Sequence, residues 1–206
     1  QTELAAGAGP LAVALQAAPV HLHQPARQCQ ADAQAALAAA GVAWMMGIPG
    51  DAVEAGLATF HGAGRRMEFK GTFNGADVYD DYAHHPEEIS AALSSIRKAY
   101  PSMKLTAAFQ PHLYTRTRDF AEEFAQALSN VDKLILLDIY PAREEPIPGV
   151  TSEIIFKDVT APEKVLLKRS EFMEYMQNEE VELLVTLGAG DIDRFVGPIA
   201  KMLENR

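Results

Sequence analysis

Two short stretches of the chain concentrate the side chains that could act on a charged substrate. Residues 80–86 read Asp-Asp-Tyr-Ala-His-His-Pro, and residues 109–118 read Phe-Gln-Pro-His-Leu-Tyr-Thr-Arg-Thr-Arg. Carboxylates and imidazoles exchange protons or bind metals, and guanidinium groups bind carboxylate or phosphate through a planar fork. Each stretch follows a run typical of a β-strand, and loops that follow parallel strands gather at one edge of a sheet. The two stretches therefore predict one site for a charged substrate.

The first stretch leaves several roles open. Asp81, His84 and His85 could ligate a metal, act as acid and base, or hold a ligand. We predict no metal site, because adjacent histidines rarely reach one ion and no further ligand follows at helical spacing. For His85 we favour a structural role as the cap of a helix that begins at Pro86.

Within the second stretch, Arg116 is the stronger candidate for binding an anion. Arg118 has acidic neighbours with which it can pair on a helix surface, namely Asp119, Glu122 and Glu123. Arg116 is instead expected in the loop that precedes this helix, where binding residues are common.

Three further segments have weaker claims on the site. Residues 140–149 are rich in proline and are expected to form an irregular loop that lines a pocket or merely connects two elements. Residues 187–191 contain two glycines, for which we favour a tight turn capped by Asp191 over a phosphate contact. Arg65 and Arg66 could be exposed charges or could reach over a nucleotide phosphate, and on composition alone we favour exposure.

The elements that must position these residues alternate along the chain. Apolar alternation on both sides of Asn74 and Gly75 predicts a β-hairpin, because both turn residues tolerate positive φ. Strands are then expected at residues 78–82, 105–109, 133–139, 164–167 and 182–187, with helices at residues 86–98, 118–128, 152–158, 170–177 and 192–203. This alternation predicts an α/β fold with a mainly parallel, Rossmann-like sheet and helices on both faces.

The first 47 residues differ in texture and are rich in Ala and Gln. We expect a helix over residues 31–46 that ends near Gly47, and a second helix from Pro49 to Phe60 with one buried face. The apolar residues 4–20 are expected to form a strand or loop, because a secretory leader would need a basic start. The boundary between this segment and the α/β domain is expected between Gly62 and Arg66.

Composition excludes several classes of function. The chain has 206 residues and a net charge of −10, with 18 basic against 28 acidic residues, so we expect no nucleic-acid surface. No run is long enough to span a membrane. The single cysteine, Cys29, permits no internal disulfide, so a cytoplasmic location is expected. No P-loop pattern occurs in the sequence.

Six motifs in the same order resemble the C-terminal part of the Mur ligases. They lie at residues 56–60, 65–69, 80–86, 109–118, 140–149 and 188–191. Within the family the match is to the alanine-adding branch. The resemblance implies an ATP- and Mg-dependent ligase of peptidoglycan synthesis that joins L-alanine to UDP-N-acetylmuramate. In that family ATP forms an acyl phosphate on the muramate carboxylate, and the alanine amine attacks it.

The resemblance also implies roles for particular residues. Arg66 and Asp81 match the arginine and aspartate that face ATP, and with His84 they are the candidate catalytic residues. Tyr82, His84, His112 and Arg116 match residues that line the site for the muramate carboxylate and the incoming amino acid. For Arg66 this implication replaces the expectation of a merely exposed charge.

The resemblance extends to the domains as well. Residues 1–64 are expected to be a remnant of the central, ATP-binding domain, and residues 65–206 the C-terminal Rossmann-like domain. The Mg ligands are expected in the central domain, so the chain is expected to be inactive without the other ligase domains. Leu113 stands where relatives often have Arg, and residues 25–32 lack the family's Gly-x-His-Asn-x-x-Asn segment.

Two other functions stay open. The first is a ligase that recycles the murein tripeptide, which shares the motif at residues 80–86. The motif at residues 110–116 favours the alanine-adding branch over it. The second is a free-standing module that binds a small anion or amino acid, which is consistent with an α/β unit that has no P-loop.

Overall fold

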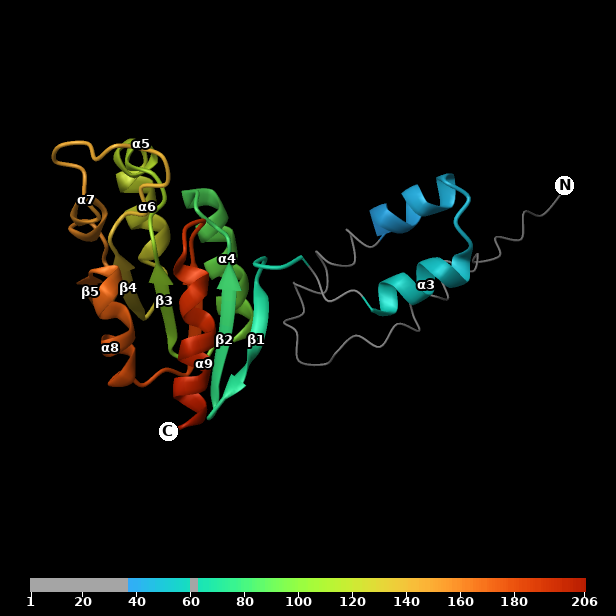
Figure 1. Ribbon diagram of the computed structural model, residues 1–206. Helices are drawn as coiled ribbons and strands as arrows, with labels where there is room; N and C mark the ends of the chain where they lie inside the picture. The colour runs from blue at the N-terminus through green and yellow to red at the C-terminus, as the bar shows by residue number, and fades with distance from the viewer. Residues whose placement is uncertain (1–36, 60–62) are drawn as a thin grey trace, which may run out of the picture. The chain divides into compact units, whose positions relative to one another are not determined.

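The computed structural model describes residues 37–59 and 63–206 (Figure 1). The chain divides into two compact units, Gln1–Gly62 and Ala63–Arg206. Residues 37–45 of the first unit are helical, within the helix predicted over residues 31–46, and Gly47 follows with a φ of 74°. The start of that helix, the apolar residues 4–20 and residues 25–32 lie outside the described residues.

The second predicted helix is present as α3, Gly50–Ala58, with Pro49 at its N-cap position. The predicted buried face was wrong, because α3 contains no buried residue. Apolar spacing predicts that a helix is amphipathic, but its burial depends on what packs against it.

The predicted hairpin is confirmed at the start of the second unit. Strands β1, Glu68–Phe73, and β2, Ala76–Asp81, pair antiparallel. The two residues between them, Asn74 and Gly75, have φ angles of 49° and 85°. Two consecutive residues with positive φ suit a tight hairpin turn, as the Asn-Gly pair predicts.

The hairpin extends a sheet whose other contacts are parallel. Its strand order is β1-β2-β6-β3-β4-β5, and the remaining strands are β3, Leu105–Phe109, β4, Lys133–Leu137, β5, Glu163–Leu167, and β6, Leu183–Leu187. At the carboxyl edge Asp81 of β2 and Phe109 of β3 both pair with Leu187 of β6. This register sets the two candidate stretches on either side of one central strand.

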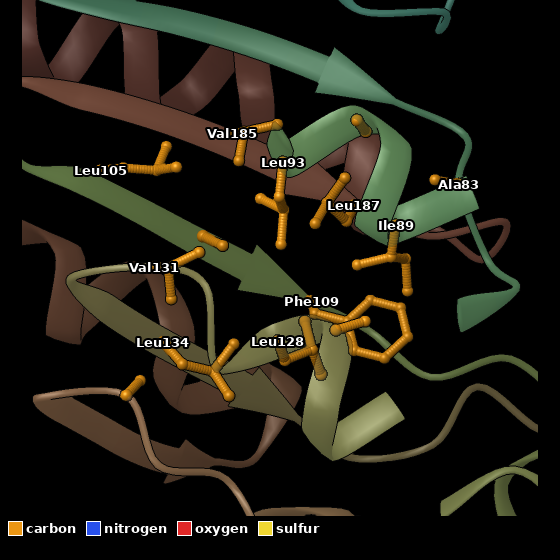
Figure 2. Packing of buried hydrophobic residues seen from close by; sticks show 14 of the residues in the cluster. Ala83, Ile89, Leu93, Leu105, Phe109, Leu128, Val131, Leu134, Val185 and Leu187 are labelled. Atoms are coloured by element: carbon orange, nitrogen blue, oxygen red, sulfur yellow. The ribbon is translucent and has the colours of Figure 1, made fainter. Parts of the chain in front are cut away.

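Helices cover both faces of this sheet, which confirms the predicted fold class. One face packs on α4, Pro86–Ala99, α6, Ala121–Leu128, and α7, Glu153–Phe156. Figure 2 shows part of this layer, where Ile89, Leu93 and Leu128 meet the strand residues Leu105, Phe109, Val185 and Leu187. The opposite face packs on α8, Phe172–Gln177, and α9, Val196–Glu204. The site therefore rests on a sheet that is buried on both sides.

Several predicted helices differ from the structure in their bounds, among them the helix expected at residues 152–158, which is only the four-residue α7. The helix expected at residues 118–128 is two helices, α5, Tyr114–Asp119, and α6. Arg116 therefore lies within α5, and its predicted place in a loop was wrong. Short 3₁₀ turns, Arg169–Glu171 and Ile192–Phe195, precede α8 and α9 where continuous helices were expected. Such turns are common at helix starts because they use the first unpaired backbone groups.

Candidate functional site

Asp81 closes β2 and anchors the backbone around it. The side chain is buried, and its two oxygens accept hydrogen bonds from the Met67 N–H at 2.6 Å and the Ala83 N–H at 2.7 Å. Burial raises the pKa of Asp81 above the ordinary aspartate value, against the opposing effect of the two N–H donors. Asp81 thus fixes the turn that carries Arg66 against the end of β2.

The two adjacent arginines of this turn have different environments. Arg65 is half-buried: its Nε lies 3.1 Å from Asp80 Oδ2, and its Nη2 donates to the Gly188 carbonyl at 2.6 Å. The expected exposure of Arg65 was therefore wrong, because the buried Asp80 carboxylate requires a cation close by. Arg66 is exposed, and its guanidinium carbon lies 5.9 Å from the centroid of the Tyr82 ring.

The adjacent residues His84 and His85 make different contacts. His85 is the N-cap of α4: its Nδ1 accepts from the Glu87 N–H, while Glu88 accepts from the N–H of His85. The predicted capping role of His85 is confirmed. His84 points elsewhere, with its Nδ1 3.0 Å from the Tyr82 carbonyl oxygen and 3.3 Å from Glu88 Oε2.

Four aromatic rings form a row that connects the two candidate stretches. Ring centroids are 5.2 Å apart from Tyr82 to His84, 6.1 Å from His84 to His112, and 5.8 Å from His112 to Tyr140. The last pair is stacked, with 14° between the ring planes. The structure therefore brings together the predicted residues Tyr82, His84 and His112, and adds Tyr140 from the loop after β4.

His112 and Arg116 each present a buried nitrogen that has no hydrogen-bond partner among the described residues. These atoms are His112 Nδ1 and Arg116 Nη1. Burial lowers the pKa of His112, and the positive charges of Arg116 and His84 lower it further. A buried polar atom without a partner costs about 1–3 kcal/mol, so native structures contain few of them. Two such atoms on neighbouring side chains suit a site that is completed by an anionic or amine ligand.

Backbone hydrogen bonds fix this second stretch against the loop after β4. The Tyr140 N–H donates to the Pro111 carbonyl at 2.8 Å, and the Leu113 N–H donates to the Tyr140 carbonyl at 3.0 Å. Leu113 has a φ of 73° and a ψ of 135°, a conformation that favours glycine. With this conformation at Leu113, α5 begins at Tyr114, two residues after His112.

Gln110 lies at the carboxyl edge of the sheet and was not among the predicted site residues. It is buried, and its side-chain amide exchanges hydrogen bonds with Asp191, from Nε2 to Oδ1 at 3.2 Å and from the Asp191 N–H to Oε1 at 3.1 Å. Asp191 also lies 2.9 Å from Arg169 Nη2. Asp191 stands at the N-cap position of the 3₁₀ turn Ile192–Phe195, as predicted, but its side chain makes no capping hydrogen bond there because its carboxylate is used in these contacts. Gln110 belongs to a motif of the sequence, but nothing in its local pattern indicates the distant contact with Asp191.

The glycines of the loop after β6 allow close packing. A Cβ at Gly190 would lie 2.5 Å from Gln110 Oε1 and 2.8 Å from Tyr140 Cγ. The tight turn predicted there is thus explained by side-chain packing. The predicted pairing of Arg118 with an acidic neighbour is also observed. Its Nε lies 2.7 Å from Asp119 Oδ1, on the exposed side of α5.

The fit of the described residues to ATP and a metal is uneven. Arg66 offers an exposed cation at the carboxyl edge, which suits a phosphate group. No group of three or more His, Cys, Asp or Glu side chains in the described ranges 37–59 and 63–206 could hold a metal ion. Over the same residues, no helix is both long and apolar enough to cross a bilayer.

Comparison with known proteins places this geometry in a family. Residues 65–192 match the family described as "Mur ligase, glutamate ligase domain". The UDP-N-acetylmuramate–L-alanine ligase of Parabacteroides distasonis is 48% identical over 81% of this chain and 36% of its own length. That of Phocaeicola vulgatus is 46% identical over 82% of the chain and 37% of its own length. The chain thus spans somewhat more than a third of these relatives.

Solved structures agree with the fold. The UDP-N-acetylmuramate-alanine ligase of Thermotoga maritima aligns with a TM-score of 0.64 and 22% identity, over 82% of this chain and 37% of that one. A murein peptide ligase of Psychrobacter arcticus aligns with a TM-score of 0.58 and 22% identity, over 75% of this chain and 33% of that one. From the match over residues 65–192 and the identity to curated relatives, we conclude that the chain belongs to the Mur ligase family.

Proposed function

We propose that this chain supplies the C-terminal domain of an ATP- and Mg-dependent ligase that joins L-alanine to UDP-N-acetylmuramate. The names of relatives that are 38–48% identical support the reaction. The observation that carries the proposal for the site is the pair of buried, unpartnered nitrogens on His112 and Arg116. They lie where the sheet register gathers the family's motifs, at the carboxyl edge.

The proposed roles follow from position and charge. Arg66 binds phosphate oxygens of ATP, and Asp81 fixes the turn that carries Arg66 through its contact with the Met67 N–H. Tyr82 and His84 extend the site towards His112 and line it with rings of mixed apolar and polar character. Asp81 is thus assigned a positioning role beside the catalytic role that the family resemblance implies.

Arg116 and His112 act on the reacting groups in this proposal. ATP activates the muramate carboxylate as an acyl phosphate, which the amine of L-alanine then attacks. The Arg116 guanidinium orients a carboxylate and balances its charge. The lowered pKa of His112 keeps its imidazole neutral at neutral pH, so that Nδ1 can accept a proton from an ammonium group or donate to an oxygen.

The proposed domain organisation assigns the metal to another part of the enzyme. Residues 65–206 form the C-terminal domain, and residues 1–64 belong to the central domain. The P-loop and the Mg ligands come from ligase domains outside this sequence, and the whole enzyme acts in the cytoplasm. The direct test mixes the 206-residue chain with ATP, Mg, L-alanine and UDP-N-acetylmuramate. Robust phosphate release would refute the dependence on further domains.

A related ligase that takes the murein tripeptide is the first alternative, because a murein peptide ligase shares the fold. The product of the complete reading frame that contains this chain separates the two functions. We expect ADP formation in the presence of UDP-N-acetylmuramate to depend on L-alanine. Turnover that requires the tripeptide, with no response to L-alanine, would assign the recycling reaction.

A free-standing binding module is the second alternative, because residues 63–206 have their own core on both faces of the sheet. Isothermal titration of L-alanine and of Mg-ATP into the 206-residue chain tests it. We expect no saturable binding of either ligand by the chain alone. Tight binding that is lost in Arg116→Ala would support the module instead.

A further inference from the structure

The loop between β4 and α7 supplies a carboxylate to the start of α5. Glu144 Oε2 accepts from the Thr115 N–H at 2.9 Å, and Glu144 Oε1 accepts from the Thr115 hydroxyl in a short contact. The N-cap residue of α5, Leu113, makes no side-chain cap of its own. Glu144 therefore does for α5 what an N-cap side chain does within other helices, but from a distant part of the sequence.

The same loop also holds His112, through Tyr140. The Tyr140 ring stacks on the His112 ring, and the Tyr140 backbone bonds to both sides of His112, at Pro111 and Leu113. The loop thus touches the second stretch at two places, His112 and Thr115, which are three residues apart. Thr115 is next to Arg116 in the sequence.

The charge of Glu144 also reaches the site. Its negative charge raises the pKa of His112, in opposition to the effects of burial and of Arg116. Hydrogen bonds from Thr115 keep the pKa of Glu144 below its ordinary value, so the carboxylate is ionised at neutral pH. Glu144 and Arg116 therefore act on the imidazole with opposite sign.

We propose that Glu144 is a positioning residue that sets Arg116 relative to His112 by clamping Thr115 to the loop after β4. The clamp fixes the first turn of α5, and with it the direction of the Arg116 side chain. Neither Arg116 Nη1 nor His112 Nδ1 has a partner within the described residues. Without the clamp, these nitrogens are free to shift towards water or towards other acceptors. For catalysis this inference rests on the proposed function, in which Arg116 and His112 hold the reacting groups.

The structural part of the test uses the 206-residue chain and needs no substrate. The imidazole of His112 is titrated by NMR in Glu144→Ala and in the control Glu145→Ala, whose side chain is exposed in the same loop. We expect the His112 midpoint to fall in Glu144→Ala and to stay unchanged in Glu145→Ala. Thr115→Val removes only the hydroxyl donor, and we expect its effect on the amide resonance of Arg116 to vanish once Glu144 is already alanine.

The kinetic part uses the product of the complete reading frame. We expect Glu144→Ala to raise the KM for L-alanine or UDP-N-acetylmuramate about tenfold or more, the scale of a displaced binding group, with the KM for ATP unchanged. Glu144→Gln, which keeps an acceptor oxygen, should restore part of the loss. A Glu144→Ala enzyme that matches Glu145→Ala in kinetics and in the His112 titration would overturn the inference. If the wild-type enzyme shows no L-alanine dependence, the proposed function fails while the NMR comparison still decides the clamp.

Discussion

Replacement of Gly190 by alanine is the sharpest test of how the site is assembled. A Cβ there would lie 2.8 Å from Tyr140 Cγ and 2.9 Å from Tyr140 Cβ, well inside the ordinary contact distance of about 3.5–4.0 Å. Tyr140 cannot retreat easily, because its backbone is bonded to Pro111 and Leu113. The third contact, 2.5 Å to Gln110 Oε1, requires Gln110 to leave its hydrogen bond with Asp191.

The expected cost follows from these contacts. Overpacking of this kind destabilises by about 1–3 kcal/mol, which corresponds to a fall in melting temperature of about 3–10 °C for a domain near 150 residues. The matched control is Gly197→Ala in α9, where nothing lies within 4 Å of the new Cβ. There we expect a change of less than about 1 kcal/mol, because the gain in helix propensity from glycine to alanine is opposed by Pro198, which disfavours a helical residue with a Cβ before it.

The assay is thermal unfolding of the 206-residue chain, followed by circular dichroism, for the two variants and the wild type. Neither substituted position has a positive φ, so left-handed backbone strain contributes to neither result. A Gly190→Ala chain that melts with the wild type would refute the packing of the loop after β6 against Gln110 and Tyr140.

Three further outcomes are expected from single substitutions. Leu113→Gly should be more stable than Leu113→Ala, by about 1 kcal/mol in chemical denaturation, because only glycine relieves a φ of 73°; the reverse order would contradict the strain. His112 should titrate below 6.5 by NMR, and Arg116→Gln should move the midpoint back upwards, since a nearby cation is removed. Because the folded pKa of His112 is below the unfolded value, its contribution to stability is lost as pH falls from about 6.5 through the folded pKa, and ligase activity should fall in the same window; a flat activity profile to pH 5 would exclude the role. Arg65→Gln should destabilise by about 1–3 kcal/mol in thermal unfolding because Asp80 stays buried, whereas Arg66→Gln should change stability by less than about 0.5 kcal/mol; equal effects would contradict the assignment of their roles.

Local patterns were sufficient to predict most of the fold. The residue pair Asn74-Gly75 is sufficient to predict the turn, since few other pairs accept two positive φ angles. Buried parallel strands such as Leu183–Leu187 read as short apolar runs, and the helical segments between them require a parallel sheet. The helix bounds at α5 were missed because the strained Leu113 starts that helix early, and a leucine at positive φ cannot be anticipated from its neighbours.

The candidate site was only partly predictable, for a different reason. His112 and Arg116 are visible in the sequence because their types suit an anionic substrate. Gln110 and Glu144 are not visible, because their importance comes from partners 81 and 29 residues away. Arg65 was likewise mistaken for a surface charge, since the buried carboxylate that holds it becomes apparent only once β2 and β6 lie side by side.

The most direct test of the central claim compares two arginines of one short helix. Arg116 has a buried nitrogen without a partner in the described part of the chain, while Arg118 is about half exposed and pairs with Asp119. ADP formation dependent on L-alanine and UDP-N-acetylmuramate is measured for the product of the complete reading frame, as wild type, Arg116→Gln and Arg118→Gln. We predict a loss of at least about a hundredfold in kcat/KM for Arg116→Gln, the scale of a displaced catalytic or binding group, and wild-type activity for Arg118→Gln. Equal activity of the two variants, or a wild type indifferent to L-alanine, would contradict the account.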